Sequence, residues 1–170
     1  MGIEREIKLK VPDDFDLEYY LINNGGKLIK REKQIDLYLD FDDLRIKSSG
    51  SALRLRISGK NYFITFKGPQ KEDLIKNRDE YEVKVSDYGQ TLKIFESIGI
   101  KEKFRITKDR ATVRFNGLNF EIDDVEGLGK FVEIEVKFDK EVERVKKIME
   151  MAGVKWNPIL KGYAELKAEK

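Results

Sequence analysis

The stretch "IEREIKLKV", residues 3–11, alternates charged and apolar side chains from the start of the chain. Alternate side chains of a β-strand share one face, so Glu4, Glu6 and Lys8 would point to one side of such a strand. Ile7 and Leu9 would point to the other side. The charged face either meets bulk water or lines an interior that needs two carboxylates and an ammonium group.

The Glu-x-Glu-x-Lys pattern of this stretch occurs three times, at residues 4–8, 80–84 and 133–137. After each copy come a few residues, then a segment with helical spacing of apolar side chains, and then glycine. A single copy carries little information in a chain so rich in Lys and Glu. Three copies in the same context indicate a strand–helix unit that is used three times with the same charged face.

Period-two alternation predicts eight strands along the chain. We expect them within residues 3–11, 34–41, 52–58, 61–68, 79–86, 110–117, 118–125 and 131–138. Two tight connections predict hairpins, because their residues tolerate the positive φ of such turns. One connection has Gly59 and Asn61, and the other has Asn116-Gly117 between two alternating runs.

Helical spacing predicts three helices that interrupt the strands. We expect the first over about residues 14–24, the second from a cap at Ser86 or Asp87 to Gly99, and the third from near Asp139 to Gly153. No stretch of the chain resembles a linker or a low-complexity segment. Residues 1–170 are therefore expected to form one α+β domain with a large, mostly antiparallel sheet or barrel and about three flanking helices.

The composition excludes several kinds of site. The chain of 170 residues has no Cys and no His, so it has no disulfide, thiolate zinc site, cysteine nucleophile or Ser-His-Asp triad. A metal would bind to carboxylates, which suits Mg²⁺, Mn²⁺ or Ca²⁺. The net charge of +2 gives no overall attraction to nucleic acid or to a membrane. No apolar signal segment is present, so we expect a cytoplasmic protein, and the wealth of Lys and Glu fits a thermophile.

The charges on the predicted strands allow two interpretations. An antiparallel sheet with one wet face shows the same alternation. A barrel with its charged face inward would instead need water, ions or a ligand in its interior. The second interpretation gains weight because basic pairs and acidic pairs lie on different strands, and like charges two residues apart repel unless something lies between them. The basic pairs are Arg54-x-Arg56 and Lys108-x-Arg110, and the acidic pairs include Glu121-x-Asp123.

The residues quoted above resemble the CYTH superfamily, which groups class IV adenylyl cyclases with thiamine triphosphatases. Its members are also called triphosphate tunnel metalloenzymes. The resemblance rests on "EREIK", "QIDLYLD", "ALRLR", "FKGP", "RDEYEVKV", "TKDR", "DDVEGLGKFVEIE" and "LKGYAEL", which follow the family's order over nearly the whole chain. The segment "DDVEGLGKFVEIE" is the most specific of them.

The resemblance implies an eight-stranded antiparallel tunnel that binds a triphosphate with Mg²⁺ or Mn²⁺. The metal carboxylates it implies are Glu4 and Glu6, with Glu133 and Glu135 opposite them, and Asp123. The triphosphate-binding residues it implies are Lys8, Arg54, Arg56, Lys67, Lys108, Arg110 and Lys161. Candidates for the chemical step are Lys8, Tyr38, Glu80 and Glu82. One departure is Gly162, where many members have serine before the tyrosine of the last strand.

Two reactions fit these residues. In a cyclase the ribose 3′-hydroxyl attacks the α-phosphorus of ATP and pyrophosphate leaves, whereas in a triphosphatase water attacks the terminal phosphorus. Both need the same charge neutralisation. The sequence favours the class IV cyclase branch, with hydrolysis of inorganic tripolyphosphate, thiamine triphosphate or a nucleoside triphosphate next. A non-catalytic polyphosphate- or nucleotide-binding module is a further alternative. We expect a monomer or homodimer whose partner is a small triphosphate and not a nucleic acid or membrane.

Overall fold

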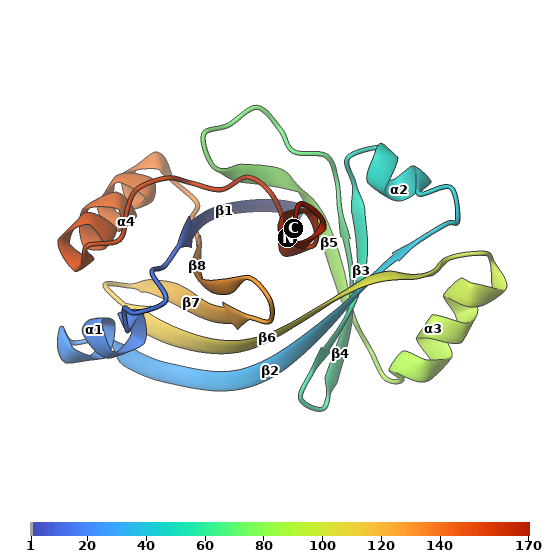
Figure 1. The fold of residues 1–170 in the computed structure, drawn as a ribbon, viewed down its shortest axis with the longest axis horizontal. Coiled ribbons are helices and arrows are strands. Elements are labelled where there is room, and N and C mark those ends of the chain that lie inside the picture. The colour runs from blue at the N-terminus through green and yellow to red at the C-terminus, as the bar shows by residue number, and fades with distance from the viewer. Residues whose placement is uncertain (1) are drawn as a thin grey trace.

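The eight predicted strands form a closed antiparallel barrel (Figure 1). The computed structural model describes residues 2–170. The order of the strands around the barrel is β1-β5-β4-β3-β2-β6-β7-β8. Their bounds are β1 Gly2–Lys10, β2 Lys27–Asp40, β3 Ala52–Ser58, β4 Asn61–Lys67, β5 Lys76–Val85, β6 Lys101–Phe115, β7 Leu118–Val125 and β8 Gly129–Glu135. The predicted α+β barrel is therefore confirmed.

The three predicted helices are confirmed, and two short ones are added. The helices are α1 Leu17–Asn23, α2 Arg45–Ser48, α3 Tyr88–Ser97, α4 Asp139–Ala152 and α5 Tyr163–Ala168. Asp87 caps α3 through its side chain, and α4 ends at Gly153 with φ of 82°. The segment that contains Tyr163 is a helix and not the last strand, so Gly162 lies at a helix N-terminus. Helices of four and six residues are too short to show a helical period in the sequence.

Both predicted hairpins are present, and one of them differs in detail from the prediction. Asn116 and Gly117 have φ of 48° and 77°, as a type I′ turn requires. In the other hairpin only Gly59 has positive φ, at 57°, and Asn61 is already the first residue of β4. The prediction for Asn61 is therefore wrong, because the two-residue loop ends one residue earlier.

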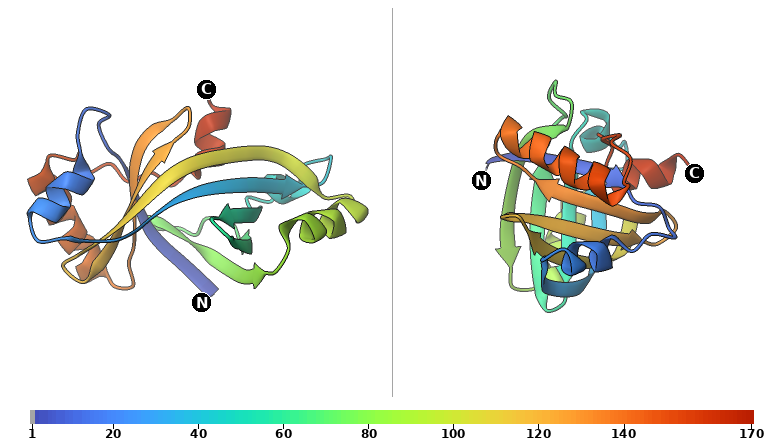
Figure 2. Two further views of the ribbon diagram at one scale, coloured as in Figure 1. Left: turned by 90° about the horizontal axis from the view of Figure 1, so that it is seen from below. Right: turned by 90° about the vertical axis from the view of Figure 1, so that its left-hand side faces the viewer.

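The apolar face of β1 points outward, where helices cover it. Ile7 and Leu9 are fully buried in a cluster that also contains Leu17 of α1 and Val145 of α4. Figure 1 shows α1 and α4 at one end of the barrel and α3 at the other, and Figure 2 shows the barrel from two further sides. Because the helices occupy the outside, the charged face of β1 is turned into the barrel.

Within residues 2–170, none of the helices has the length and apolar character needed to cross a membrane.

Candidate triphosphate and metal site

A cavity of about 820 Å³ fills the interior of the barrel, and all eight strands contribute to its lining. Its volume lies in the range of small-molecule sites. Most of the residues that the sequence predicts for the site line this cavity. They are Glu4, Glu6, Lys8, Tyr38, Arg54, Arg56, Lys67, Glu80, Glu82, Lys108, Arg110, Glu133 and Glu135.

Lys161 does not line the cavity, which corrects its predicted place in the triphosphate site. Its ammonium group is half exposed and pairs with Glu169. The backbone carbonyl of Lys161 faces the barrel instead, where it accepts a hydrogen bond of 3.1 Å from Nζ of Lys8. Lys161 therefore contributes its backbone carbonyl to this region, while its ammonium group pairs with Glu169.

Asp123 also differs from its predicted role, because its oxygens are already occupied. The carboxylate is fully buried and accepts hydrogen bonds of 2.6 Å from both Nε and Nη2 of Arg110. The hydroxyl of Tyr163 donates a further bond of 2.7 Å to it. In this arrangement Asp123 is bonded to Arg110 and Tyr163, and it does not belong to the cluster of three other carboxylates in the cavity.

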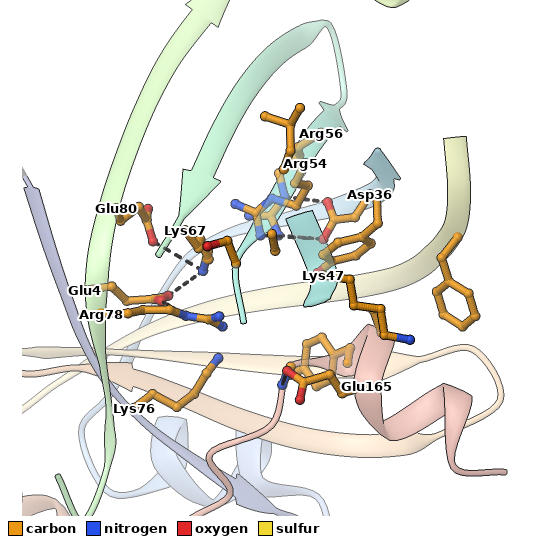
Figure 3. Close-up of a pocket in the computed structure, with 18 of the residues that line it drawn as sticks. Glu4, Asp36, Lys47, Arg54, Arg56, Lys67, Lys76, Arg78, Glu80 and Glu165 are labelled. Carbon is orange, nitrogen blue, oxygen red and sulfur yellow. Dashed lines mark hydrogen bonds and ion pairs between the residues drawn. The ribbon is translucent and has the colours of Figure 1, made fainter. Parts of the chain in front are cut away.

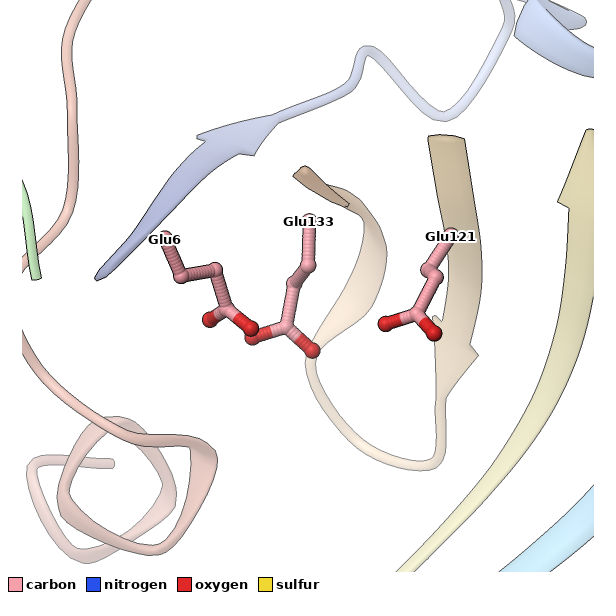
Figure 4. A group of neighbouring side chains, drawn as sticks. All are labelled: Glu6, Glu121 and Glu133. Atoms are coloured by element: carbon pink, nitrogen blue, oxygen red, sulfur yellow. The ribbon is translucent and has the colours of Figure 1, made fainter. Parts of the chain in front are cut away.

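Three carboxylates gather at one place in the cavity, from β1, β7 and β8 (Figure 4). One oxygen each from Glu6, Glu121 and Glu133 lies within 4.8 Å of the others. Burial and the neighbouring charge of Glu133 raise the pKa of Glu6 to about 8. Burial likewise raises the pKa of Glu121. Like charges at this spacing favour either a shared proton or a cation.

The position of Glu133 follows from the strand register. Glu133 pairs with Lys8 of β1 on one side and with Glu121 of β7 on the other. Glu133 and Glu135 therefore lie on the strand next to the first one, where β8 closes the barrel against β1 and Glu135 is the direct cross-strand partner of Glu6. In the sequence, Glu121 stands out only as part of the acidic pair with Asp123, and the register is what brings it to the cluster.

Glu4 belongs to a different part of the cavity (Figure 3). It accepts bonds of 2.6 Å from Lys67 and 3.2 Å from Arg78. Burial opposes the charged form of Glu4, but Lys67 and Lys76 outweigh it and lower the pKa to about 2. Lys67 also pairs with Glu80 at 3.3 Å. Glu4 is thus a fixed anion among basic groups.

Two basic residues of the cavity, Lys76 and Arg78, were missed in the sequence. Lys76 is 3% exposed and lies 3.0 Å from Glu6 and 3.7 Å from Glu133. Burial opposes its charge, but these carboxylates raise its pKa above the usual value. The predicted strand began at residue 79, whereas β5 begins at Lys76. Extending the period-two alternation back from Glu80 would have found both residues.

The two predicted arginines of β3 differ in how many of their donors are occupied. Arg56 forms two bonds to Asp36, of 2.6 and 2.8 Å. Arg54 donates from Nη2 to the Thr65 hydroxyl at 3.2 Å, while its Nε is buried and has no partner among the described residues. Burial alone would raise the pKa of Asp36, but Arg56 and Arg54 hold it well below its usual value. Arg54 thus lines the cavity and has one buried donor without a hydrogen-bond partner among the described residues.

Three predicted residues have pKa values that burial shifts. Burial, reinforced by Lys76, lowers the pKa of Lys8 to about 7. Burial, reinforced by Arg110, lowers the pKa of Lys108 to about 8. Burial and the charge of Asp36 raise the pKa of Tyr38, so its phenol stays protonated at neutral pH. A neutral phenol can donate a hydrogen bond but is a poor base.

One part of the cavity lining is apolar. It is formed where α2 and α5 meet β3 and β6, and its members are Leu44, Ile46, Leu53, Phe104, Ala164 and Ala168. Lys47 and Glu165 are further lining residues from the same two helices (Figure 3). The cavity thus combines a highly charged interior with an apolar portion that polar phosphates would not require.

Comparisons with known proteins agree with this architecture. The model of the CYTH domain family matches residues 2–163. A Methanocaldococcus jannaschii protein named "Putative adenylate cyclase MJ0240" is 37% identical over 97% of this chain and 98% of its own. The structure of the PH1819 protein from Pyrococcus horikoshii has a TM-score of 0.83 at 29% identity, covering 98% of both chains.

A more distant structure shares the fold alone. It is that of "Putative adenylyl cyclase HpAC1" from Hippeastrum, which is reported with a dominant triphosphatase activity. It has a TM-score of 0.79 at 18% identity and covers 99% of this chain and 96% of its own. The family match spans nearly all of the chain, and the strand order and charged interior agree with it. The chain belongs to the CYTH domain family.

Proposed function

We propose that this protein is a divalent-metal-dependent enzyme that binds a triphosphate inside the barrel and converts ATP to cyclic AMP and pyrophosphate. The observation that carries the proposal is that buried basic groups and a cluster of three carboxylates line one cavity. Arg54 keeps an unpaired Nε there, and Lys8 and Lys108 are each at most 3% exposed. Such buried donors suit phosphate oxygens.

The carboxylate cluster fits a hard divalent cation. Glu6, Glu121 and Glu133 offer only oxygen ligands, and burial together with the charge of Glu133 already raises the pKa of Glu6. These three residues would hold Mg²⁺ or Mn²⁺. When bound, the cation supplies neutralisation of negative charge on the phosphate oxygens. The basic side chains contribute the rest of that neutralisation from the walls of the barrel.

In the proposed reaction the ribose 3′-hydroxyl attacks the α-phosphorus, and the bond to the bridging oxygen of pyrophosphate breaks. The proton of the hydroxyl passes to a base, and the pyrophosphate leaves with the charge of the broken bond. Glu80 and Glu82 line the cavity as carboxylates and are candidates for that base, together with the buried Lys8. Tyr38 is better placed as a donor, because its pKa is raised.

The apolar portion of the cavity favours an organic triphosphate over inorganic tripolyphosphate. Leu44, Leu53 and Phe104 present apolar surface where a planar base would lie beside the charged interior. The 37% identical relative carries a cyclase name. Hydrolysis of an organic triphosphate is the second candidate, because the same charges serve attack by water and a protein of this fold is reported with a dominant triphosphatase activity.

The deciding experiment is product analysis with purified protein. The protein is incubated with Mn²⁺ and ATP, and separately with Mn²⁺ and tripolyphosphate, while cyclic AMP, pyrophosphate and orthophosphate are measured. Equal amounts of cyclic AMP and pyrophosphate from ATP support the cyclase, and orthophosphate supports the triphosphatase. Binding without any product indicates a binding module. Neither binding nor product would overturn the proposal.

A further inference from the structure

The side chain of Tyr163, the first residue of α5, reaches into the charged interior from the C-terminal part of the chain. Tyr163 is 3% exposed, and its hydroxyl donates to Asp123 at 2.7 Å. Its ring faces two ammonium groups. Nζ of Lys8 lies 3.8 Å from the ring centroid, and Nζ of Lys108 lies 4.8 Å from it. Two buried lysines therefore share one aromatic ring.

The carboxylates beside these two lysines are shared with other cations. Glu133 lies 3.5 Å from Lys8 and 3.9 Å from Lys108, and Asp123 is closer to Lys108, at 3.4 Å. Glu133 is divided among four cations, because it also pairs with Arg110 at 2.6 Å and Lys76 at 3.7 Å. The mutual repulsion of buried ammonium groups must be offset elsewhere. The face of a phenol ring attracts a desolvated cation, so the ring supplies that offset.

The backbone around Tyr163 is tied to the same lysine. The backbone N–H of Ile159 donates to the carbonyl of Lys8 at 2.9 Å. Nζ of Lys8 in turn donates to the carbonyl of Lys161 at 3.1 Å. The segment that precedes Tyr163, residues 159–161, is thus hydrogen-bonded to both the backbone and the side chain of Lys8. The hydroxyl bond to Asp123 then orients the ring within this frame.

We propose that Tyr163 is a positioning residue of the triphosphate site, whose ring holds the ammonium groups of Lys8 and Lys108 where they meet phosphate oxygens. The proposal rests on the proposed function, because it assumes that these lysines bind a triphosphate. Through Tyr163, α5 would then complete a site whose other residues lie on the barrel strands. The hydroxyl is the less important part, since Asp123 keeps both of its bonds to Arg110 without it.

The test compares two substitutions of Tyr163 by calorimetric titration with tripolyphosphate in chelator. Tyr163→Phe keeps the ring, so its affinity stays within about threefold of the parent's. Tyr163→Leu removes the ring and lowers the affinity about tenfold or more. Phe120→Leu is the matched control, because Phe120 is fully buried in the cluster outside the barrel. It should lower the melting temperature and leave tripolyphosphate affinity unchanged.

Two results would overturn the role of the ring. One is a folded Tyr163→Leu protein that binds tripolyphosphate as tightly as the parent. The other is a Tyr163→Phe protein that loses as much affinity as Tyr163→Leu. Melting temperatures of all variants separate loss of the fold from loss of the site. Absence of tripolyphosphate binding by the parent, both in chelator and with Mn²⁺, would overturn the proposed function, and this assignment with it.

Discussion

Glu4 and Glu6 lie two residues apart on one face of β1, but their neighbours shift the pKa values of the two carboxyl groups in opposite directions. Glu4 lies between Lys67 and Arg78, which hold it as an anion against the cost of burial. Glu6 faces Glu133, so burial and a like charge favour its protonated form. The Glu-x-Glu spacing of β1 therefore provides one anion that basic groups hold and one carboxyl group that belongs to the carboxylate cluster.

This difference predicts opposite effects of Glu→Gln substitution on the metal-free protein. Glu4→Gln leaves Lys67 and Arg78 without their anion, so we expect a loss of about 3 kcal/mol in the free energy of unfolding at pH 7. The folded-state pKa of Glu4 is about 2, below its ordinary 4.5. Its contribution is therefore present above pH 4.5 and is lost as the pH falls toward 2. Urea unfolding in chelator measures it, and an unchanged stability at pH 7 would contradict the pairing.

Glu6→Gln should act in the other direction. The folded-state pKa of Glu6 is raised from 4.5 to about 8, so the folded protein retains a proton that the unfolded chain releases. The parent therefore loses stability as the pH rises from 4.5 to about 8, whereas glutamine has no proton to lose. We expect the stability of Glu6→Gln relative to the parent to increase over this range in chelator. A difference that stays constant from pH 5 to pH 8 would show that Glu6 is ionised throughout.

The two arginines of β3 should contribute unequally to triphosphate binding. Arg54 has a free buried Nε, whereas two donors of Arg56 are held by Asp36. We expect Arg54→Ala to cost about 1.5–3 kcal/mol, or roughly tenfold or more in tripolyphosphate affinity measured by calorimetry. Arg56→Ala should also weaken binding, partly by freeing Asp36 to repel the ligand. The exposed Lys137 is the control, and equal effects of Lys137→Ala and Arg54→Ala would contradict the assignment.

At the scale of the elements, the turns that join the barrel strands depend on backbone conformation more than on side chains. The β6–β7 hairpin needs positive φ at both residues of its turn. The helix α3 instead contains a glycine, Gly89, whose φ is not positive. The same substitution should therefore have opposite effects at two glycines.

We expect Gly117→Ala to destabilise the protein by about 1–2 kcal/mol, because an alanine is strained at φ of 77°. Gly89→Ala should stabilise it by about 0.5 kcal/mol, since alanine favours the helix. Neither residue lines the cavity, so tripolyphosphate affinity should stay that of the parent in both. Urea unfolding of the two variants tests the turn assignment. A stabilised Gly117→Ala would show that the hairpin is not of type I′.

At the scale of the whole molecule, the barrel encloses charges of both signs that largely pair with one another. Lys67 with Glu4, Lys76 with Glu6 and Arg56 with Asp36 are examples of these internal pairs. Buried charges without ligand are costly, and internal pairing offsets part of that cost. The triphosphate brings negative charge to the basic side chains, and the cation brings positive charge to the acidic ones. Binding of both should therefore stabilise the folded barrel.

We expect Mn²⁺ with tripolyphosphate to raise the free energy of unfolding by about 2.7 kcal/mol when the ligand is at a hundredfold excess over its dissociation constant. Tripolyphosphate in excess chelator should give a smaller rise, because the carboxylate cluster is then without its cation. Turnover of the substrate should stop in chelator and return with added Mn²⁺. Thermal melts with and without Mn²⁺ measure the first effect, and full turnover in chelator would exclude the metal dependence.

The amino-acid sequence by itself determined the elements and their two faces. Period-two alternation located each of the eight strands, and glycines and capping residues located the three longer helices, because these signals are local in the chain. The motifs also determined the family, since their order along the chain can be read from the sequence without the structure. Most of the predicted basic and acidic residues line the cavity for the same reason: they share a strand face with the motif residues.

Only the tertiary structure decided which charged groups meet. Alternation is the same for a wet outer face and for a barrel interior, and closure of β8 against β1 turned the charged face inward. The strand register then brought Glu6, Glu121 and Glu133 together from three strands and committed Asp123 to Arg110 and Tyr163. Electrostatic roles depend on distances of a few ångström between residues far apart in sequence, and only folding sets these distances.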